Sequence, residues 1–357
     1  MRTADFDYAL SADLIAQWPT PERDQSRLMV VRREDGQIFH RRFLDVVEYF
    51  APGDVLVLND SHVIPARLRA RKMNTGGEVE VLLAEENAPN DWWVMLRPGK
   101  RAREGTRIVL LDHYGRPAGL EATVAAKNVE GLCRLQFAGT ANVLDRLDAL
   151  GEVPLPPYIA RESDSPSVDR DRYQTVYARE PGSVAAPTAG LHFTAKVLDE
   201  IRARGVNVCF VTLHVGLGTF ASVKSEQVEQ HLLHEERFRL PSATAEAINT
   251  ARLNHRRIFA VGTTTLRVLE AVAAGHGGQL VPAGGRTGIF IYPPFGFRIA
   301  DALLTNFHLP RSTLLMLACA FAAPGEIRGR DLILAAYAEA IHRRYRFYSY
   351  GDAMLIV

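Results

Sequence analysis

The sequence predicts an α/β domain built from both ends of the chain, with a small antiparallel β-barrel inserted between its two halves. Two observations carry this prediction. From about Val63 to Phe137, short strand candidates alternate with turn residues and show no long helical period. From about Gly182 onward, strand and helix patterns alternate, which is typical of an α/β fold.

The beginning of the chain matches its later part and not the segment that follows it. Pro52-Gly53 turns into the strand-like run Val55-Leu56-Val57-Leu58. Because the ends of a domain often lie close together, an insertion at a loop tip is tolerated. We therefore expect residues 1–62 and 150–357 to form the α/β domain and residues 63–149 to form the inserted barrel.

The strand candidates of the insert are short and are bounded by glycine or proline. They are Glu78–Val81 after Gly76-Gly77, Trp92–Leu96 before Pro98-Gly99, Thr106–Leu111 and Leu132–Phe137.

In the α/β part, a helix capped by Thr194 has Val197, Leu198 and Ile201 on one face and ends before Gly205. The later elements follow in order: a strand over Val208–His214, a helix capped by Ser242, a strand over Ile258–Val261, a helix over Thr264–Ala274, strands over Ile289–Tyr292 and Leu303–Phe307, and a helix over Ile333–Tyr345. The polar segment Ser163–Asp171 is predicted to be a mobile surface loop.

Composition excludes several classes of protein. Of the 357 residues, 47% are hydrophobic and 23% are charged, which argues against disorder. The formal net charge of +1 means that a nucleic-acid partner would need a local basic patch. Three scattered cysteines favour a reducing compartment, and the longest apolar run, Leu314–Ala323, is too short to span a bilayer. We expect a cytoplasmic protein with no membrane contact.

Four stretches place histidine, threonine or asparagine at predicted strand ends. They are Ala185–Phe193, Val211–Phe220, Val261–Thr265 and Leu304–Pro310. Ligands of α/β folds bind at the carboxyl ends of strands, where glycines let a ligand approach the backbone. A single histidine or a Gly-x-Gly pair in such a place is more often structural, but four such ends in one domain favour a polar pocket.

The histidines do not indicate a metal site. His231 and His234 are three residues apart, yet no cysteine or second histidine pair supports them. A solvated or capping role is the more economical interpretation, and we expect no metal.

A basic run surrounds the Pro98-Gly99 turn of the insert. Arg97, Lys100, Arg101 and Arg103 lie within seven residues of one another. Such a run is either a solvated face or a contact for a phosphate backbone. Arg343-Arg344-Tyr345-Arg346 is a lesser candidate for the same role.

At these residues the chain resembles the S-adenosylmethionine:tRNA ribosyltransferase-isomerase family of queuosine biosynthesis, from its first residues to its last. The four stretches above belong to the family pattern. So do Arg23-Asp24-x-Ser26-Arg27-Leu28, Gly53-Asp54-x-Leu56-Val57-Leu58-Asn59-Asp60, Val63-Ile64-Pro65-Ala66-Arg67-Leu68, Gly151–Ile159, Tyr173–Tyr177 and Tyr345–Met354. Two positions depart from it: Glu235 replaces a serine, and Pro294 replaces a glycine.

The resemblance implies that the ribosyl part of S-adenosylmethionine passes to 7-aminomethyl-7-deazaguanine at the wobble position of tRNA. Isomerisation then gives epoxyqueuosine, and adenine and methionine leave. S-adenosylmethionine is a substrate in this reaction, so no cofactor is implied, and we expect a monomer.

The reaction requires a base beside the sulfonium and an acceptor for the proton of the attacking amine. The catalytic candidates are His214, which we place first because it adjoins the glycine turn, then His192, His308 and Asp352, with Glu236 as a further carboxylate. Arg267 is a candidate for binding the methionine carboxylate bidentately, and Tyr350 or Phe307 for stacking on adenine. The remaining substrate-binding candidates are Thr188, Gly190, Thr212, Gly216, Gly218, Thr219, Thr263, Thr264 and Asn306.

Two other functions compete with this one. A methyltransferase would explain a pocket for S-adenosylmethionine, but the expected glycine-rich loop with an acidic residue about 20 positions later is absent from the sequence. A non-catalytic RNA-binding protein would explain the basic run but not the histidine and threonine residues at the strand ends.

Overall fold

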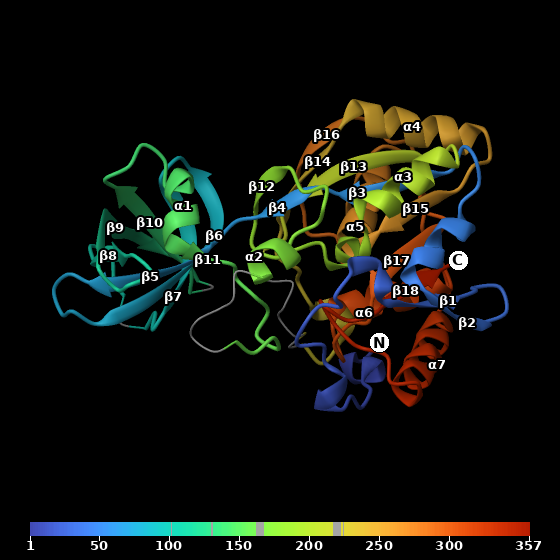
Figure 1. The fold of residues 1–357 in the computed structure, drawn as a ribbon, viewed down its shortest axis with the longest axis horizontal. Coiled ribbons are helices and arrows are strands. Elements are labelled where there is room, and N and C mark those ends of the chain that lie inside the picture. The colour runs from blue at the N-terminus through green and yellow to red at the C-terminus, as the bar shows by residue number, and fades with distance from the viewer. Residues whose placement is uncertain (101, 130, 162–167, 217–222, 224) are drawn as a thin grey trace.

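A computed structural model describes residues 1–357 except 101, 130, 162–167, 217–222 and 224. Figure 1 shows a β-barrel on the left and a larger domain of helices around a sheet on the right, with both chain termini in the larger domain. The fold class predicted from the sequence is confirmed.

The barrel contains six antiparallel strands in the order β5-β6-β7-β10-β9-β8, and it closes because β8 pairs with β5. The strands are β5 (Arg67–Lys72), β6 (Glu78–Ala88), β7 (Asp91–Arg97), β8 (Arg107–Leu111), β9 (Pro117–Lys127) and β10 (Cys133–Ala138). The helix α1 (Leu144–Leu150) packs against it, and β11 (Gly151–Glu152) extends it beside β5. Alternate residues such as Trp92, Val94 and Leu96 fill the interior.

The larger domain is built on a nine-stranded mixed sheet in the order β16-β14-β13-β3-β15-β17-β18-β1-β2. Its strands are β1 (Arg27–Val31), β2 (Ile38–Arg42), β3 (Val55–Asn59), β13 (Asn207–Leu213), β14 (Glu236–Leu240), β15 (Ile258–Val261), β16 (Ala283–Thr287), β17 (Ala302–Asn306) and β18 (Ala353–Ile356). Its centre, β13-β3-β15-β17, is parallel, so these four strands end at one edge of the sheet.

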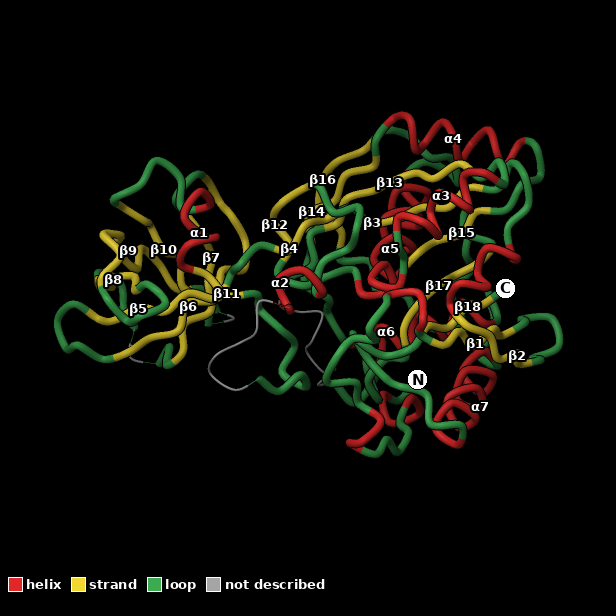
Figure 2. Tube along the Cα trace, in the orientation of Figure 1, coloured by secondary structure: helices red, strands yellow, loops and turns green. Residues whose placement is uncertain are grey.

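Helices cover both faces of this sheet, as Figure 2 shows by colour. They are α3 (Ala195–Ala203) with the 3₁₀ segment η4 (Phe43–Tyr49) on one face, and α4 (Ser242–Leu253), α5 (Gly262–Gly275), α6 (Thr313–Ala322) and α7 (Gly329–His342) on the other.

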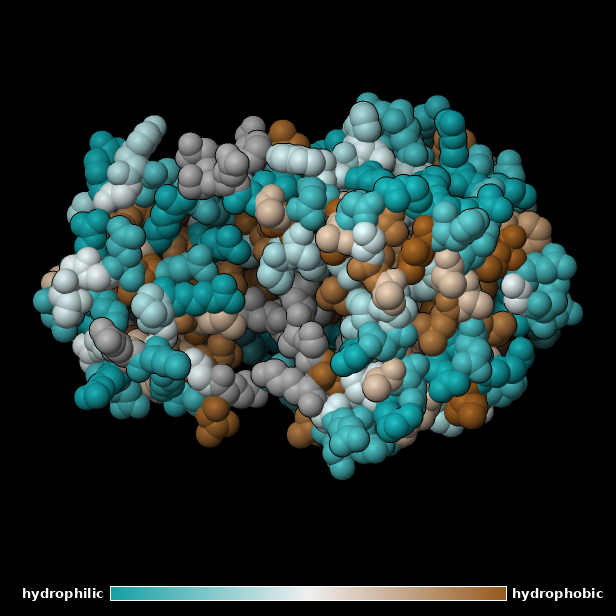
Figure 3. Space-filling model, turned by 90° about the horizontal axis from the view of Figure 1, so that it is seen from below, coloured by the Kyte–Doolittle hydropathy of each residue, from teal (hydrophilic) through white to brown (hydrophobic). Residues whose placement is uncertain are grey.

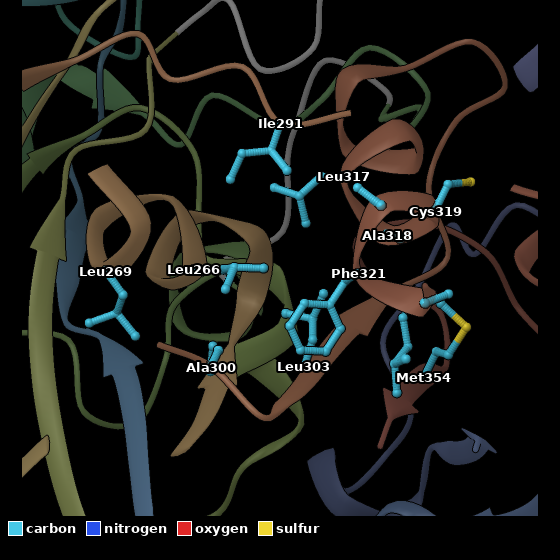
Figure 4. Close-up of a cluster of buried hydrophobic side chains, with 14 of the residues drawn as sticks. Leu266, Leu269, Ile291, Ala300, Leu303, Leu317, Ala318, Cys319, Phe321 and Met354 are labelled. Carbon is cyan, nitrogen blue, oxygen red and sulfur yellow. The ribbon is translucent and has the colours of Figure 1, made fainter. Parts of the chain in front are cut away.

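Alternation along the central strands assigns side chains to the two faces. Val55 and Val57 of β3 join the core under α4 to α7, whereas Leu56 and Leu58 join the core under α3. In Figure 4, Leu266 of α5 and Phe321 of α6 lie over Leu303 of β17 in the first of these cores. Fully buried strands therefore need apolar residues at consecutive positions, which explains the run from Val55 to Leu58.

The barrel joins the larger domain through a small parallel sheet of β4 (Ser61–Val63) and β12 (Glu180–Ser183). A short helix, α2 (Val168–Arg172), lies nearby in Figure 1. Seen from below, hydrophilic side chains cover most of both domains, and hydrophobic residues reach the surface in scattered places (Figure 3). Among the described residues, no helix combines the length and the apolar character needed to cross a membrane.

Local predictions were partly confirmed. Thr194 caps α3 by accepting a hydrogen bond from the backbone N–H of Val197, and Gly205 has a positive φ of 79° after the helix. Ser242, in contrast, is the first residue of α4, and no side chain caps that helix. The helix α5 begins at Gly262, two residues before the predicted start, and α7 ends at His342 before Tyr345.

One strand prediction was wrong, and one loop prediction was contradicted only in its described end. Ile289–Tyr292 forms no strand in the structure; the edge strand is the preceding segment β16, which contains two glycines. The predicted mobile loop falls partly on residues 163–167, which lie outside the described residues. Its end forms α2, where buried Asp169 pairs with Arg161 and accepts a hydrogen bond from the Tyr350 hydroxyl.

Candidate active site

Two adjoining pockets lie where the parallel strands end. The large pocket has a volume of about 620 Å³ and the small pocket of about 70 Å³. Leu314 of α6 lines both pockets. Ligand pockets at strand ends of α/β folds commonly have volumes of about 300–1,000 Å³, so the large pocket can hold a nucleoside-sized molecule.

Both domains form the wall of the large pocket. The barrel contributes Trp92, Met95 and the carboxylate-bearing Glu85 among others, and the larger domain contributes His214, Glu236 and Arg267. The site therefore depends on how the inserted barrel lies against the sheet.

His214 directly follows β13, and its ring lines the large pocket. Its Nδ1 is 2.9 Å from the hydroxyl of Ser61, and Nε2 has no hydrogen-bond partner among the described residues. Gly182 lies against the ring, since a Cβ there would stand 3.1 Å from two of its atoms. Burial, assisted by the charge of Arg237, lowers the pKa of His214 to about 4, so the ring is neutral near pH 7.

Arg267 and Glu236 form an ion pair in the wall of the large pocket, with side chains only 6% and 8% exposed. The Nη1 of Arg267 donates to Glu236, and its Nε donates to the carbonyl of Ile289 at 3.2 Å. Its Nη2 is buried and has no partner among the described residues. The backbone N–H of Gly216 donates to the same carboxylate at 3.0 Å. A buried guanidinium nitrogen without an acceptor is a site for an anionic oxygen.

The small pocket lies between the ends of β15 and β17 and the segment η5 (Thr188–His192). Thr188, Thr263, Thr264, Asn306 and His308 line it, as the sequence predicted for a polar pocket. Val215 lines it as well, whereas the neighbouring residues His214 and Gly216 line the large pocket. The turn after β13 therefore borders both pockets.

His308 faces the small pocket as a neutral residue. Burial lowers its pKa to about 3, and its Nε2 lies 2.7 Å from the hydroxyl of Thr305. Its backbone is fixed by two tyrosines: the His308 N–H donates to the hydroxyl of Tyr337, and the Tyr8 hydroxyl donates to the His308 carbonyl.

Several predicted residues lie outside both pockets. The first is His192, which belongs to the 3₁₀ segment η5 and not to a strand end, and whose two ring nitrogens both contact protein groups. Asp352 accepts hydrogen bonds from the backbone N–H groups of Arg27 and Arg346 and pairs with the Arg27 guanidinium. Neither side chain lines a pocket: His192 contacts Asn306 of the small pocket from behind, and Asp352 ties together the segments of Arg27 and Arg346.

The same holds for three substrate-binding predictions. The hydroxyl of Thr212 donates to Asp60 at 2.8 Å. The hydroxyl of Tyr350 donates to Asp169 at 2.8 Å, and Tyr350 lines neither pocket, so it offers no stacking surface there. Gly190 packs against Tyr177, whose hydroxyl would clash with any added Cβ. Phe307, the other stacking candidate, does line the small pocket.

The basic run lies on the barrel. Arg97, Lys100 and Arg103 are exposed at the end of β7 and in the turn after it. Arg101 from the same run, and the substrate-binding candidates Gly218 and Thr219, lie outside the described residues.

Sequence reasoning missed two contacts of the site. Ser61, the partner of His214, carries no signal in the sequence because it is 153 residues away. The second is a bridge between the domains: Arg286 pairs with Glu85 of the barrel and with Glu235 of the larger domain. The family departure at Glu235 thus supplies one carboxylate of this bridge at the rim of the large pocket. Pro294, the other departure, is exposed and lines neither pocket.

Within the described part of the chain, no three His, Cys, Asp or Glu side chains gather in a way that could hold a metal ion.

The chain is similar to known proteins over its whole length. A family model described as "Queuosine biosynthesis protein" matches residues 3–356. Proteins named S-adenosylmethionine:tRNA ribosyltransferase-isomerase from Carboxydothermus hydrogenoformans, Acetivibrio thermocellus and Staphylococcus epidermidis are 48%, 49% and 46% identical to the chain, over 100% of both sequences. A crystal structure of S-adenosylmethionine tRNA ribosyltransferase from Thermotoga maritima is similar at 38% identity and a TM-score of 0.55, covering 99% of this chain and 100% of that one.

Proposed function

Because the chain belongs to the S-adenosylmethionine:tRNA ribosyltransferase-isomerase family of queuosine biosynthesis, we propose that its two adjoining pockets are the active site of that reaction. The enzyme transfers the ribosyl moiety of S-adenosylmethionine to a tRNA base and isomerises it. The observation that carries the assignment is a pocket of nucleoside size lined both by His214 and by Arg267, whose buried Nη2 has no partner among the described residues.

In this proposal the methionine end of S-adenosylmethionine binds in the large pocket at Arg267. The Nη2 of Arg267 donates to the methionine carboxylate, since Nε and Nη1 already donate to Ile289 and Glu236. A single contact through Nη2 therefore replaces the bidentate contact between Arg267 and the methionine carboxylate that the sequence analysis expected. Glu236 then lies where it can attract the α-ammonium group, so the ion pair of the wall matches the two charges of the amino acid.

His214 is the general base of the proposal. The sulfonium acidifies the adjacent 5′-carbon of ribose, and a neutral imidazole can remove that proton through Nε2 while Nδ1 stays bonded to Ser61. A second acceptor takes the proton of the attacking amine, and His308 in the small pocket is neutral and available for it. Burial explains why both rings are unprotonated near pH 7.

The finer details of the substrate are also proposals. The acceptor is 7-aminomethyl-7-deazaguanine at the wobble position, and the product is epoxyqueuosine in tRNA with release of adenine and methionine. A base within an RNA stem-loop must leave its stack to reach such a pocket. The exposed residues Arg97, Lys100 and Arg103 of the barrel contact the phosphate backbone. The enzyme acts as a cytoplasmic monomer without a cofactor.

Incubation of the enzyme with tRNA and with S-adenosylmethionine labelled in both its ribose and its methyl group tests this function. Ribose label on tRNA together with free adenine is the expected result. Methyl label alone on tRNA would indicate a methyltransferase, and the absence of both labels on tRNA would leave only RNA binding.

A further inference from the structure

Asn306, at the end of β17, is held in one orientation by its neighbours. Its Nδ2 lies 3.2 Å from the carbonyl oxygen of Tyr348 and 3.2 Å from Nε2 of His192. A carbonyl oxygen only accepts hydrogen bonds, so the atom facing Tyr348 must be the amide NH₂. The other end of the amide, Oδ1, is buried and has no partner among the described residues.

The same reasoning determines the state of His192. Because Nδ2 of Asn306 is a donor, Nε2 of His192 must accept, and its proton must be on Nδ1. Nδ1 then donates to the hydroxyl of Ser26 at 2.7 Å, and that hydroxyl donates to the carbonyl of Arg23 at 3.4 Å. His192 also stacks on Phe43, with ring centroids 5.1 Å apart. The ring is neutral, since burial and the charges of Arg23 and Arg346 lower its pKa to about 3.

The small pocket combines this acceptor with hydrogen-bond donors. Val261 pairs with Leu304 in the sheet, so the start of α5 lies beside Thr305 and Asn306. Among the described residues no side chain caps α5, and Gly262, Thr263 and Thr264 of its first turn line the pocket, where N–H groups of a helix start can donate to a ligand. An acceptor beside donors matches the edge of a nucleobase.

Charge and size narrow the choice of ligand. None of the described residues lining the small pocket is Asp, Glu, Lys or Arg. An ammonium group would lose its hydration there without a counter-charge, and a carboxylate would face the lone pairs of Oδ1. The volume of about 70 Å³ is below the roughly 150 Å³ of a cavity that holds benzene, so only one edge of a ring system enters. The rest of the ring then lies toward the large pocket, past the shared residue Leu314.

We propose that the small pocket binds the hydrogen-bonding edge of a purine-type base, with Asn306 Oδ1 accepting an N–H of that edge and His192 acting as a positioning residue for Asn306. This inference rests on the proposed function, which supplies two such bases. Adenine of S-adenosylmethionine offers its 6-amino group beside N1. The 7-deazaguanine of tRNA offers N1–H beside O6.

A ligand comparison with the unmodified enzyme separates these sources. The measurement is the Kd of S-adenosylmethionine and of its purine counterpart, in which a hydrogen atom replaces the 6-amino group while N1 remains an acceptor. If adenine occupies the pocket, the purine compound binds about 10- to 100-fold more weakly, because Oδ1 is then left without a donor. If the tRNA base occupies it, the two compounds bind alike, but free 7-deazaguanine inhibits the reaction much more strongly than its 1-methyl derivative.

Variants locate the effect at Asn306. Asn306→Ala abolishes the discrimination if adenine is bound; if the tRNA base is bound, it raises the KM for tRNA about 10- to 100-fold without changing the Kd of S-adenosylmethionine. Asn249→Ala is the matched control: its amide makes two hydrogen bonds with the backbone of Leu280, neither residue lines a pocket, and the change leaves both quantities unchanged.

The positioning role of His192 has its own pair of variants. His192→Gln keeps an acceptor toward Asn306 and retains base discrimination, whereas His192→Phe keeps the stacking on Phe43 but abolishes discrimination. Equal discrimination in the two His192 variants would remove that residue from the proposal.

The whole inference is overturned if the unmodified enzyme binds S-adenosylmethionine and its purine counterpart equally and is inhibited equally by both 7-deazaguanines. Transfer of ribose label to tRNA by the same preparation separates this failure from failure of the proposed function.

Discussion

Lowering the pH should destabilise the larger domain through two buried histidines before most carboxylates titrate. His192 and His308 are 4% and 8% exposed, and burial lowers the pKa of each to about 3. In the unfolded chain both have the ordinary pKa of 6.5. Between pH 6.5 and pH 3 the unfolded state therefore binds more protons than the folded state. The free energy of unfolding is highest above pH 6.5 and declines as the pH falls toward 3.

The size of the effect follows from these pKa values. Between about pH 7.5 and pH 5, the proton uptake of each histidine on unfolding rises from about 0.1 to nearly one, which lowers the free energy of unfolding by about 2 kcal/mol. The two together cost about 4 kcal/mol, a large share of the 5–15 kcal/mol typical of folded proteins. Carboxylates contribute little in this range because their ordinary pKa values are about 4.

Urea unfolding followed by far-ultraviolet circular dichroism measures this decline in stability. The signal reports mainly the larger domain, since all described α-helices except α1 lie outside the barrel. In His192→Gln, the decline between the two pH values should shrink by about 2 kcal/mol, whatever the absolute stability of the variant. His113→Asn, a change of an exposed histidine in a barrel turn, should leave the decline unchanged. A pH dependence in His192→Gln equal to that of the unmodified protein would refute the reasoning.

Further predictions concern the reaction. His214→Ala should lower the single-turnover rate by about 10² to 10⁴ while the Kd of S-adenosylmethionine changes far less, and a nearly normal rate would pass the role of base to another group. Arg267→Met should weaken binding of S-adenosylmethionine more than of 5′-methylthioadenosine, which lacks the carboxylate; equal weakening in calorimetry would contradict the contact through Nη2. Replacing Arg97, Lys100 and Arg103 by alanine should flatten the plot of log tRNA affinity against log salt by roughly 0.7 to 0.9 for each phosphate that the variant no longer binds, and an unchanged slope would assign docking to another surface. Activity should survive exhaustive chelation, so inactivation by EDTA and recovery with one metal would refute the expectation of a metal-free reaction.

The candidate site was partly predictable because strand ends are visible in the sequence. His214 and Asn306 were singled out because polar residues follow apolar runs in an α/β pattern, and Arg267 because the implied substrate carries a carboxylate; the structure places all three in pocket walls. His192 follows no strand. It lies in the 3₁₀ segment η5 that begins after Pro187, and no periodic pattern indicates where its ring lies.

The wrong strand over Ile289–Tyr292 has a similar cause. An apolar run reports burial and does not report which hydrogen bonds satisfy the backbone. Ile289, Phe290 and Ile291 are apolar because they line the large pocket, while the strand pairing beside β14 belongs to the glycine-containing β16.

The sequence by itself determined what depends on neighbouring residues and on family pattern. The alternation of Val55, Leu56, Val57 and Leu58 dictates a strand buried on both faces, and motifs along the whole chain identify the family. Only the tertiary structure decided the partners of the functional side chains. His214 meets Ser61 across 153 positions, Asn306 meets His192 across 114, and Arg286 meets Glu85 across 201. Such contacts result from the order of strands in the sheet and the placement of the barrel, which local periodicity does not encode.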